Sequence, residues 1–226
     1  MEKLPIKIGT RKNVDAWKTV VEADPNRILV YDVETTGVTT FDHVTTCAWA
    51  VGGEVKYFTF GDDTSEFEED WRNASGVVTF NGTYFDEKFI KKDFNISEHT
   101  RHCDLRFFLK ADGRKGGLKK IAEAENMFRP ADLKDVDGSF AITIWKYYQE
   151  TEDEEALNQL LAYNIWDVIL TAELFKKFVM PVLPTDLVNP FSIDLKKLQI
   201  IKDYWDKPRL IDDTEANLKP KVDPVS

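Results

Sequence analysis

Apolar runs divide the chain into a strand-rich first half and a helix-rich second half. Short runs of β-branched and aromatic residues, bounded by turn residues, predict strands. Apolar positions that recur every three or four residues predict helices, which dominate the second half. The predicted strands are residues 27–33, 43–51, 54–60, 76–80 and 101–105, and the predicted helices are residues 13–23, 62–75, 86–94, 117–127, 139–150, 153–179 and 192–205.

The order of these elements predicts an α/β protein. Gly52 and Gly53 separate the second predicted strand from the third, and a two-residue glycine turn is typical of a β-hairpin. With the first strand, the hairpin makes three antiparallel neighbours. Because strands come first and helices are then interleaved, we expect a mixed five-stranded sheet with helices on both faces. We assign residues 26–180 to this domain, 1–25 to an N-terminal extension, and 181–226 to a C-terminal helix and proline-containing tail.

Composition and charge narrow the class of protein. The 226 residues are 42% hydrophobic and 31% charged, and no apolar run approaches the roughly 18 residues of a membrane span. The first residues lack the apolar stretch of a signal peptide. Cys47 and Cys103 lie far apart, so a disulfide scaffold or a zinc ribbon is not expected and a cytoplasmic location is. The net charge of −10 argues against a broadly basic nucleic-acid-binding face, but bound Mg²⁺ can attract phosphate locally.

Two carboxylates stand at the end of the first predicted strand. Asp32 and Glu34 follow the apolar residues 28–31 and lie two apart, so their side chains point to the same face of a strand. Like charges in a partly buried place repel one another and lose solvation. One interpretation is an acidic surface turn. The other is that a divalent cation supplies the missing positive charge.

Two further aspartates are candidates for the same site. Asp86 follows a strand and the Asn81-Gly82 turn, in the expected first turn of a helix, where it also fits as a simple helix-start residue. Asp167 lies four residues after Tyr163, on a helix face that we expect to be at least partly covered. No Lys or Arg lies three or four residues away from it. The remaining alternative is a hydrogen bond from a nearby hydroxyl or backbone amide.

Three motifs carry a family resemblance. The segments YDVETTG (31–37), FNGTYFD (80–86) and YNIWD (163–167) resemble the three motifs of the DEDD superfamily of 3′–5′ exonucleases. The tyrosine four residues before the last aspartate is similar to the DEDDy subgroup. Residues 117–175 resemble most closely the YprB-like branch. The resemblance implies a ribonuclease-H-like (DnaQ-like) fold and an enzyme that releases 5′-mononucleotides from the 3′ ends of single-stranded DNA or RNA.

The resemblance also implies roles for individual residues. Two divalent ions, Mg²⁺ or Mn²⁺, would be held by Asp32, Glu34, Asp86 and Asp167, with Asp32 bridging both ions. Tyr163 would position the attacking water. Thr35, Thr36 and Gly37 would lie beside the terminal nucleotide, although they also fit a strand-ending turn.

Other substrate contacts follow from residue type and are open to a second interpretation. Asn81 is a candidate contact or a turn residue, and Phe85 either stacks on a base or belongs to the core. Residues 110–120 form the one concentrated basic, glycine-rich segment, in which Arg114, Lys115 and Lys119 either hold a phosphate backbone or belong to a solvated loop. Asp104 is a fifth carboxylate that could reach the site.

Two other functions compete with the exonuclease. One is a catalytically silent, nucleic-acid-associated scaffold subunit that docks a protein partner through residues 192–205 and the tail. The other is an endonuclease or junction resolvase of the same fold. No membrane association is expected.

Overall fold

A mixed β-sheet between two layers of helices forms the body of the protein. The computed structural model describes residues 6–7, 11–94, 96–133 and 136–179. The sheet has the strand order β1-β6-β5-β2-β3-β4, in which β2, β3 and β4 are antiparallel neighbours and the other pairs are parallel. The strands are β1 (Ile6–Lys7), β2 (Ile28–Thr35), β3 (Val44–Val51), β4 (Glu54–Thr59), β5 (Gly76–Thr79) and β6 (Arg101–Asp104).

The predicted α/β fold is confirmed, with one addition. The five predicted strands form a mixed sheet, and the two-residue strand β1 extends it at the edge beside β6. So short a strand shows no alternation of apolar and polar residues, and the sequence pattern therefore missed it. The predicted hairpin is present, since Gly52 and Gly53 have positive φ angles of 60° and 84° between β3 and β4. Such angles match the twist of the flanking strands.

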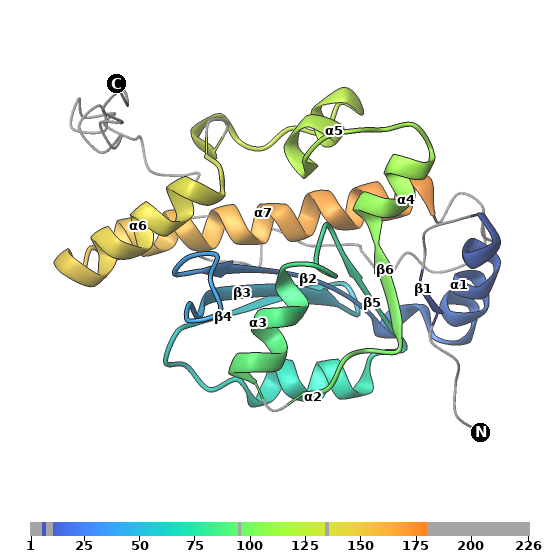
Figure 1. Cartoon of the computed structure of the whole chain (residues 1–226), viewed down its shortest axis with the longest axis horizontal. Coiled ribbons are helices and arrows are strands. Elements are labelled where there is room, and N and C mark those ends of the chain that lie inside the picture. The colour runs from blue at the N-terminus through green and yellow to red at the C-terminus, as the bar shows by residue number, and fades with distance from the viewer. Residues whose placement is uncertain (1–5, 8–10, 95, 134–135, 180–226) are drawn as a thin grey trace.

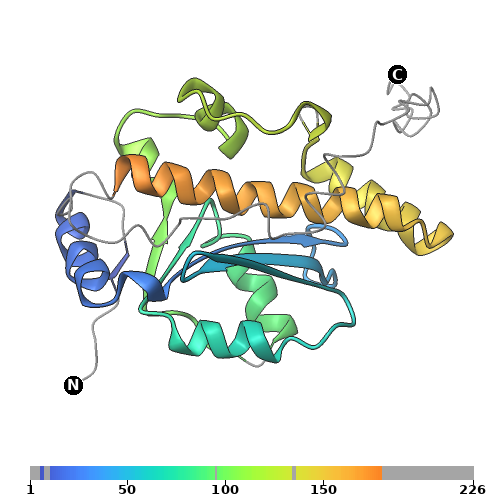
Figure 2. The same ribbon diagram turned by 180° about the vertical axis from the view of Figure 1, so that it is seen from behind.

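Helices cover both faces of this sheet. In Figures 1 and 2, the long helix α7 crosses one face and α2 lies across the other. The helices are α1 (Arg11–Ala23), α2 (Ser65–Asn73), α3 (Asp86–Asp93), α4 (Leu105–Ala111), α5 (Leu118–Ala124), α6 (Gly138–Thr151) and α7 (Glu154–Phe178), with short 3₁₀ turns η1 (Pro25–Arg27) and η2 (Ala131–Leu133). Within the described residues, none of them combines the length and the hydropathy that a membrane crossing requires. The predicted helix 192–205 and the tail lie outside the described residues, and the domain boundaries stay a prediction.

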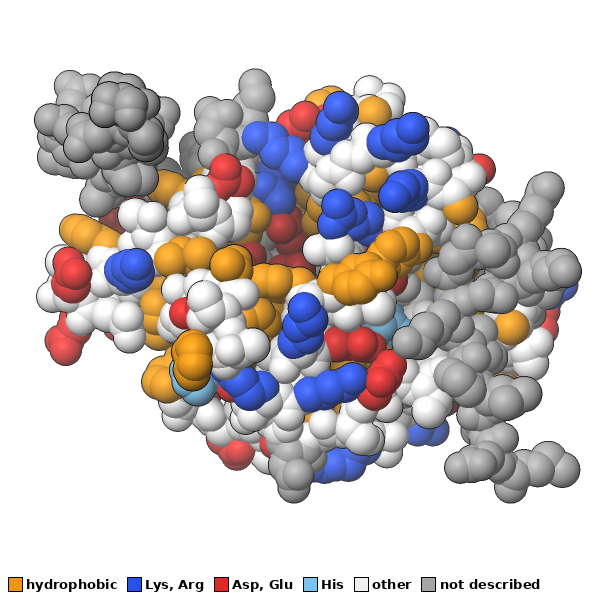
Figure 3. All heavy atoms as spheres, viewed as in Figure 1, with side chains coloured by type: hydrophobic (Ala, Val, Ile, Leu, Met, Phe, Trp, Pro, Cys, Tyr) orange, Lys and Arg blue, Asp and Glu red, His pale blue; other side chains and the backbone are white. Residues whose placement is uncertain are grey.

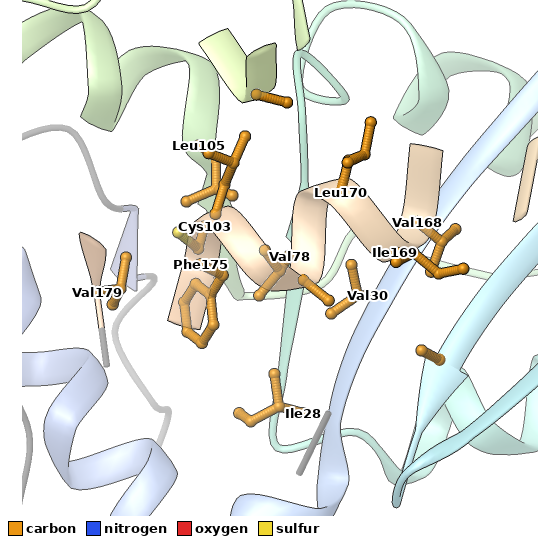
Figure 4. Close-up of a cluster of buried hydrophobic side chains, with 14 of the residues drawn as sticks. Ile28, Val30, Val78, Cys103, Leu105, Val168, Ile169, Leu170, Phe175 and Val179 are labelled. Carbon is orange, nitrogen blue, oxygen red and sulfur yellow. The ribbon is translucent and has the colours of Figure 1, made fainter. Parts of the chain in front are cut away.

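The alternation of side chains on β2 places the two halves of the core. Ile28 and Val30 belong to the cluster under α7, which also contains Val168 and Phe175 (Figure 4). Leu29, between them in sequence, belongs to the cluster on the opposite face. Because side chains on a strand alternate between faces, the positions two and four residues after Val30 also face α7. These positions are Asp32 and Glu34, so the acidic pair lies on the same face of β2 as the core residues Ile28 and Val30.

The helix α1 is held against the sheet by a close contact at a glycine. Trp17 is fully buried in the core cluster under α7, and its ring meets the edge of the Phe175 ring at a centroid distance of 5.9 Å. A Cβ atom added to Gly76, the first residue of β5, would lie 2.5 Å from that tryptophan ring. The approach of α1 to the sheet therefore depends on a residue without a side chain.

The contact at Gly76 can be tested by a change in stability. We expect Gly76→Ala to lower the free energy of unfolding by about 1–3 kcal/mol, because the added methyl group overpacks a filled core. Gly138→Ala is the matched control, since a Cβ atom there meets no other atom within 4 Å. Urea unfolding followed by tryptophan fluorescence measures both. Equal midpoints for the two variants would show that α1 does not pack as described.

Candidate metal centre

Three carboxylates from two distant segments meet above the end of β2. Asp32 and Glu34 come from β2, and Asp167 comes from α7. Each offers an oxygen atom, and these oxygens all lie within 4.8 Å of one another. Glu34 and Asp167 are buried, with 9% and 6% of their surface exposed. The arrangement crowds negative charge into a place with little water.

The local structure of β2 explains why the carboxylates have room. In the antiparallel ladder, Asp32 pairs with Ala48 and Glu34 pairs with Thr46, so both cross-strand neighbours on β3 are small. Directly paired residues share a face of the sheet. The register then shifts between Glu34 and Thr35, where the strand leaves regular pairing. A bulge at such a place re-aims side chains, as bulges next to active sites commonly do.

Asp86 joins the site from another direction. It is the first residue of α3, is 3% exposed, and its Oδ1 accepts a hydrogen bond of 3.0 Å from the backbone N–H of Val33. The parallel pairing of β2 with β5 ends at Val30 and Val78, so Val33 has no partner on β5. The structure therefore fixes Asp86 to the strand that carries Asp32 and Glu34, although it is not one of the three carboxylates within 4.8 Å.

The electrostatics of the cluster favour a bound cation. Burial raises the pKa of Asp32 and of Glu34 well above the usual value, and the charges of the neighbouring carboxylates raise both further. Burial also raises the pKa of Asp86 to about 7, against the opposing effect of the hydrogen bond from Val33. Such shifts mean that the ionised forms lack sufficient compensating positive charge.

One cation within the protein already approaches the cluster. The Nη2 of Arg129 donates to Oδ1 of Asp167, and its Nη1 donates to the carbonyl oxygen of Val136 at 3.0 Å. The guanidinium lies 4.5 Å from the centroid of the Tyr163 ring, and the Arg129 side chain is 5% exposed. Burial raises the pKa of Asp167, and Arg129 opposes that rise.

Sequence reasoning missed Arg129. No cation lies three or four residues from Asp167, and Arg129 lies 38 residues away, between α5 and η2. The path of the chain between these elements decides the contact, and no local spacing indicates it.

Asn164 was also missed, although a signal was present. Its Nδ2 donates a hydrogen bond of 2.8 Å to Oδ2 of Asp32, and the residue is fully buried. Asn164 lies three residues before Asp167, so helical spacing places the two on one side of α7. A search along that helix face for polar residues would have found it.

Tyr163 lies in the same buried region. It is 5% exposed, and burial, with the charges of Asp167 and Glu34, raises the pKa of its phenol further above the usual value of 10.0. The hydroxyl therefore keeps its proton at neutral pH. Such a group can donate a hydrogen bond but is a poor base.

The segment after the acidic pair forms a tightly bonded turn. Thr35 Oγ1 donates to the carbonyl oxygen of Gly37 at 2.5 Å, and Thr36 Oγ1 donates to Oδ1 of Asp42 at 2.9 Å. A Cβ atom on Gly37 would lie 2.6 Å from the Asp42 carboxylate, so the turn requires a glycine. Thr35, Thr36 and Gly37 thus form the predicted strand-ending turn directly beside the cluster.

The loop between β5 and α3 is pinned by Asp104. The Asp104 carboxylate accepts hydrogen bonds from the backbone N–H groups of Asn81 at 2.8 Å and of Thr83 at 3.1 Å. Asn81 has a positive φ of 74°, as a turn residue often does. Phe85 is partly buried against Phe89, with ring centroids 5.0 Å apart. Asp104 therefore organises the loop instead of joining the three clustered carboxylates.

The three basic candidates have different surroundings. Arg114 is engaged by Glu125 at 3.0 Å, by Asp112, and by the Phe178 ring at 4.0 Å. Lys115 is exposed. Lys119 lies close enough to Asp137 to contribute, after Ser139, to lowering the pKa of that carboxyl.

Two comparisons relate this chain to known proteins. The EXO domain of Nibbler from Aedes aegypti is one similar solved structure, at 12% sequence identity and a TM-score of 0.38 over 82% of this chain and 94% of that one. No curated protein sequence matches the chain. The family model described as the RNase_H superfamily matches residues 29–179. This span contains the acidic cluster, the strands β3 to β6 and all of β2 except its first residue. The chain therefore belongs to that superfamily.

Proposed function

We propose that the protein is a 3′–5′ exonuclease that hydrolyses phosphodiester bonds with two divalent ions, Mg²⁺ or Mn²⁺, and releases 5′-mononucleotides. The observation that carries this proposal is the convergence of Asp32, Glu34 and Asp167 within 4.8 Å. Membership of the nuclease superfamily supports a nucleic-acid substrate. The motif resemblance described above, with its tyrosine, favours the DEDDy subgroup and the YprB-like branch, and single-stranded DNA or RNA 3′ ends as the substrate.

The residues of the cluster fit divalent ions. Carboxylate oxygens are the ligands that hard cations prefer, and their raised pKa values show that they lack positive charge. Asp32, Glu34, Asp86 and Asp167 would hold the ions. When bound, such ions stabilise charge on the phosphate and on the leaving oxygen, and they make water a better nucleophile.

The neighbouring side chains position the reacting groups. Tyr163 keeps its proton and its hydroxyl hydrogen-bonds to Asp167, so it would position the attacking water next to that carboxylate. Asn164 fixes the Asp32 carboxylate through its amide, and Arg129 fixes Asp167. These two are positioning residues, since they act through the carboxylates. Partners of this kind commonly change metal affinity or activity by about 10- to 100-fold when they are removed.

The remaining candidates would contact the strand. The backbone of the turn formed by Thr35, Thr36 and Gly37 would lie beside the terminal nucleotide. The other proposed contacts are Asn81, Phe85, Arg114, Lys115 and Lys119. Arg114 is also bound by Glu125 and Asp112, so it would hold the loop in place as well.

The proposed activity is tested with 5′-labelled single strands and Mn²⁺. We expect a ladder that shortens from the 3′ end, and a loss of at least about 100-fold in rate for Asp32→Asn and for Asp167→Asn, because ligands matter at least as much as their outer partners. Glu173→Gln is the control, since it lies on the same helix with 38% of its side chain exposed.

The other outcomes of that experiment separate the competing functions. Internal cuts would indicate an endonuclease or resolvase. An absence of cleavage, unchanged by Asp32→Asn, would indicate a scaffold subunit.

The stability of the metal-free protein should fall as the pH rises. The pKa of Asp86 increases from 3.8 to about 7, so the folded state binds this proton more tightly than the unfolded chain does. The resulting stabilisation is complete below about pH 4 and is lost as the pH rises through 7, by at most about 4 kcal/mol for this group. Added Mn²⁺ requires ionised ligands, so its stabilising effect should grow over the same range.

Thermal unfolding at about pH 5.5 and about pH 8, with EDTA or with Mn²⁺, measures both effects. The variant Asp32→Asn should show a flatter pH dependence, because it removes one of the repelling charges. A melting temperature in EDTA that does not fall with pH, together with an equal Mn²⁺ effect at both values, would contradict the proposed metal site.

Removing the charge of Arg129 should make the protein more dependent on metal. We expect Arg129→Met to destabilise the metal-free protein by about 3–5 kcal/mol, because it leaves the buried Asp167 charge unpaired. Arg129→Lys, which keeps the charge, should cost less. Mn²⁺ should then raise the melting temperature of Arg129→Met more than that of the wild type, as a replacement for the lost cation.

Differential scanning fluorimetry with and without Mn²⁺ measures these shifts, with Arg72→Met as the exposed control. If the Mn²⁺-induced shift is the same in wild type and in Arg129→Met, the arginine does not act as a counter-charge to the cluster.

A further inference from the structure

A hollow lined by basic and aromatic side chains lies at the loop that leads from β5 to Asp86. It has a volume of about 420 Å³ and is formed by the loop between β5 and α3, which contributes Asn81 and Tyr84, and by α4 with the loop that follows it. In Figure 3, Lys and Arg side chains gather over α4 and α5, next to a recess in which acidic side chains are visible.

The charge of this hollow is opposite to that of the whole protein. Its lining includes Arg106, Lys110 and Lys115, all exposed, and no carboxylate among the described residues. Within the described part of the chain, no ion pair joins any of these three cations to an acidic side chain. On a chain with a net charge of −10, such a group of cations is suited to an anionic ligand.

Aromatic rings line the same hollow. Tyr84 is 61% exposed, and its ring meets the edge of the Phe107 ring at a centroid distance of 5.4 Å. An exposed tyrosine held by a second ring is a platform on which a base can stack. The exposed aromatic side chain of this loop is therefore Tyr84, whereas Phe85 packs toward the core.

The hollow is held in shape by its own contacts. Arg106 Nη1 donates a hydrogen bond of 2.6 Å to Oδ1 of Asn81, and Asp104 accepts from the backbone of Asn81 and of Thr83. The guanidinium is thus oriented before any ligand arrives. Preorganisation of this kind lowers the entropic cost of binding.

We propose that this hollow binds a nucleotide of the single strand on the 5′ side of the bond that is cut, with its phosphate on Arg106, Lys110 and Lys115 and its base on Tyr84. The inference rests on the proposed function, which it deepens by adding a second subsite. Asn81 and Asp86 are five residues apart, so the hollow lies within about 17 Å of Asp86, which is hydrogen-bonded to Val33 between Asp32 and Glu34. A strand of a few nucleotides can span both.

The test is the binding of a fluorescent oligothymidylate of about ten nucleotides, within the range of 4–16 nucleotides of single-strand sites. Fluorescence anisotropy is measured in EDTA and again with Ca²⁺, over a series of salt concentrations. The double variant Lys110→Ala/Lys115→Ala is compared with Lys18→Ala/Lys146→Ala, which removes the same charge from α1 and α6. Tyr84→Ala removes the ring without changing the charge.

We expect the first double variant to bind at least about 10-fold more weakly and to lose about 1.4 from the slope of log K against log salt, or 0.7 for each phosphate contact. Tyr84→Ala should weaken binding by roughly 10-fold and leave the slope unchanged. The control double variant should resemble the wild type.

Three results would overturn the inference: no binding by the wild type in either condition, equal weakening by both double variants, or equal competition by polyglutamate, which would indicate an acidic protein segment as the ligand. These are distinct from failure of the proposed function. Binding that depends on the hollow without cleavage in Mn²⁺ contradicts only the nuclease proposal, whereas cleavage with binding that is independent of the hollow contradicts only the subsite.

Discussion

The repulsion among buried carboxylates is the constraint around which this structure is built. Asp32, Glu34 and Asp167 occupy positions that the fold otherwise gives to apolar core residues, and burial disfavours their ionised forms. A fold accepts such a cluster only when positive charge or protons offset it. Arg129 and the amide of Asn164 supply part of that compensation from within the chain. The negative charge that they do not offset favours the binding of cations at this end of β2.

Local periodicity made a large part of this arrangement predictable. Two-residue spacing placed Asp32 and Glu34 on one face of a strand, and the four-residue spacing of Tyr163 and Asp167 placed both on one side of a helix. Each of these relations is decided within a few residues. The sequence also indicated that Asp167 needed a partner, because its helix face was expected to be covered.

Relations that depend on the path of the whole chain were not predictable in this way. The partner of Asp167 is Arg129, which a loop brings back to the helix from 38 residues away. The hydrogen bond from Val33 to Asp86 depends on where the pairing of β5 with β2 ends, and no pattern in either strand indicates that point. The hollow at the loop between β5 and α3 likewise combines two segments whose basic and aromatic residues gave only weak separate signals.

The helix α7 contacts both the acidic cluster and the loop that carries Arg114. Its middle carries Tyr163, Asn164 and Asp167, while near its end Lys177 contacts Glu125 at 2.7 Å and Phe178 packs on Arg114, which holds the basic loop. A helix turns by about 100° per residue, so the gain or loss of one residue between Asp167 and Lys177 would move Lys177 and Phe178 to another side of α7. The number of residues between Asp167 and Lys177 is therefore constrained. Substitutions there can change the side chains, but an insertion or deletion would separate the basic loop from the acidic cluster.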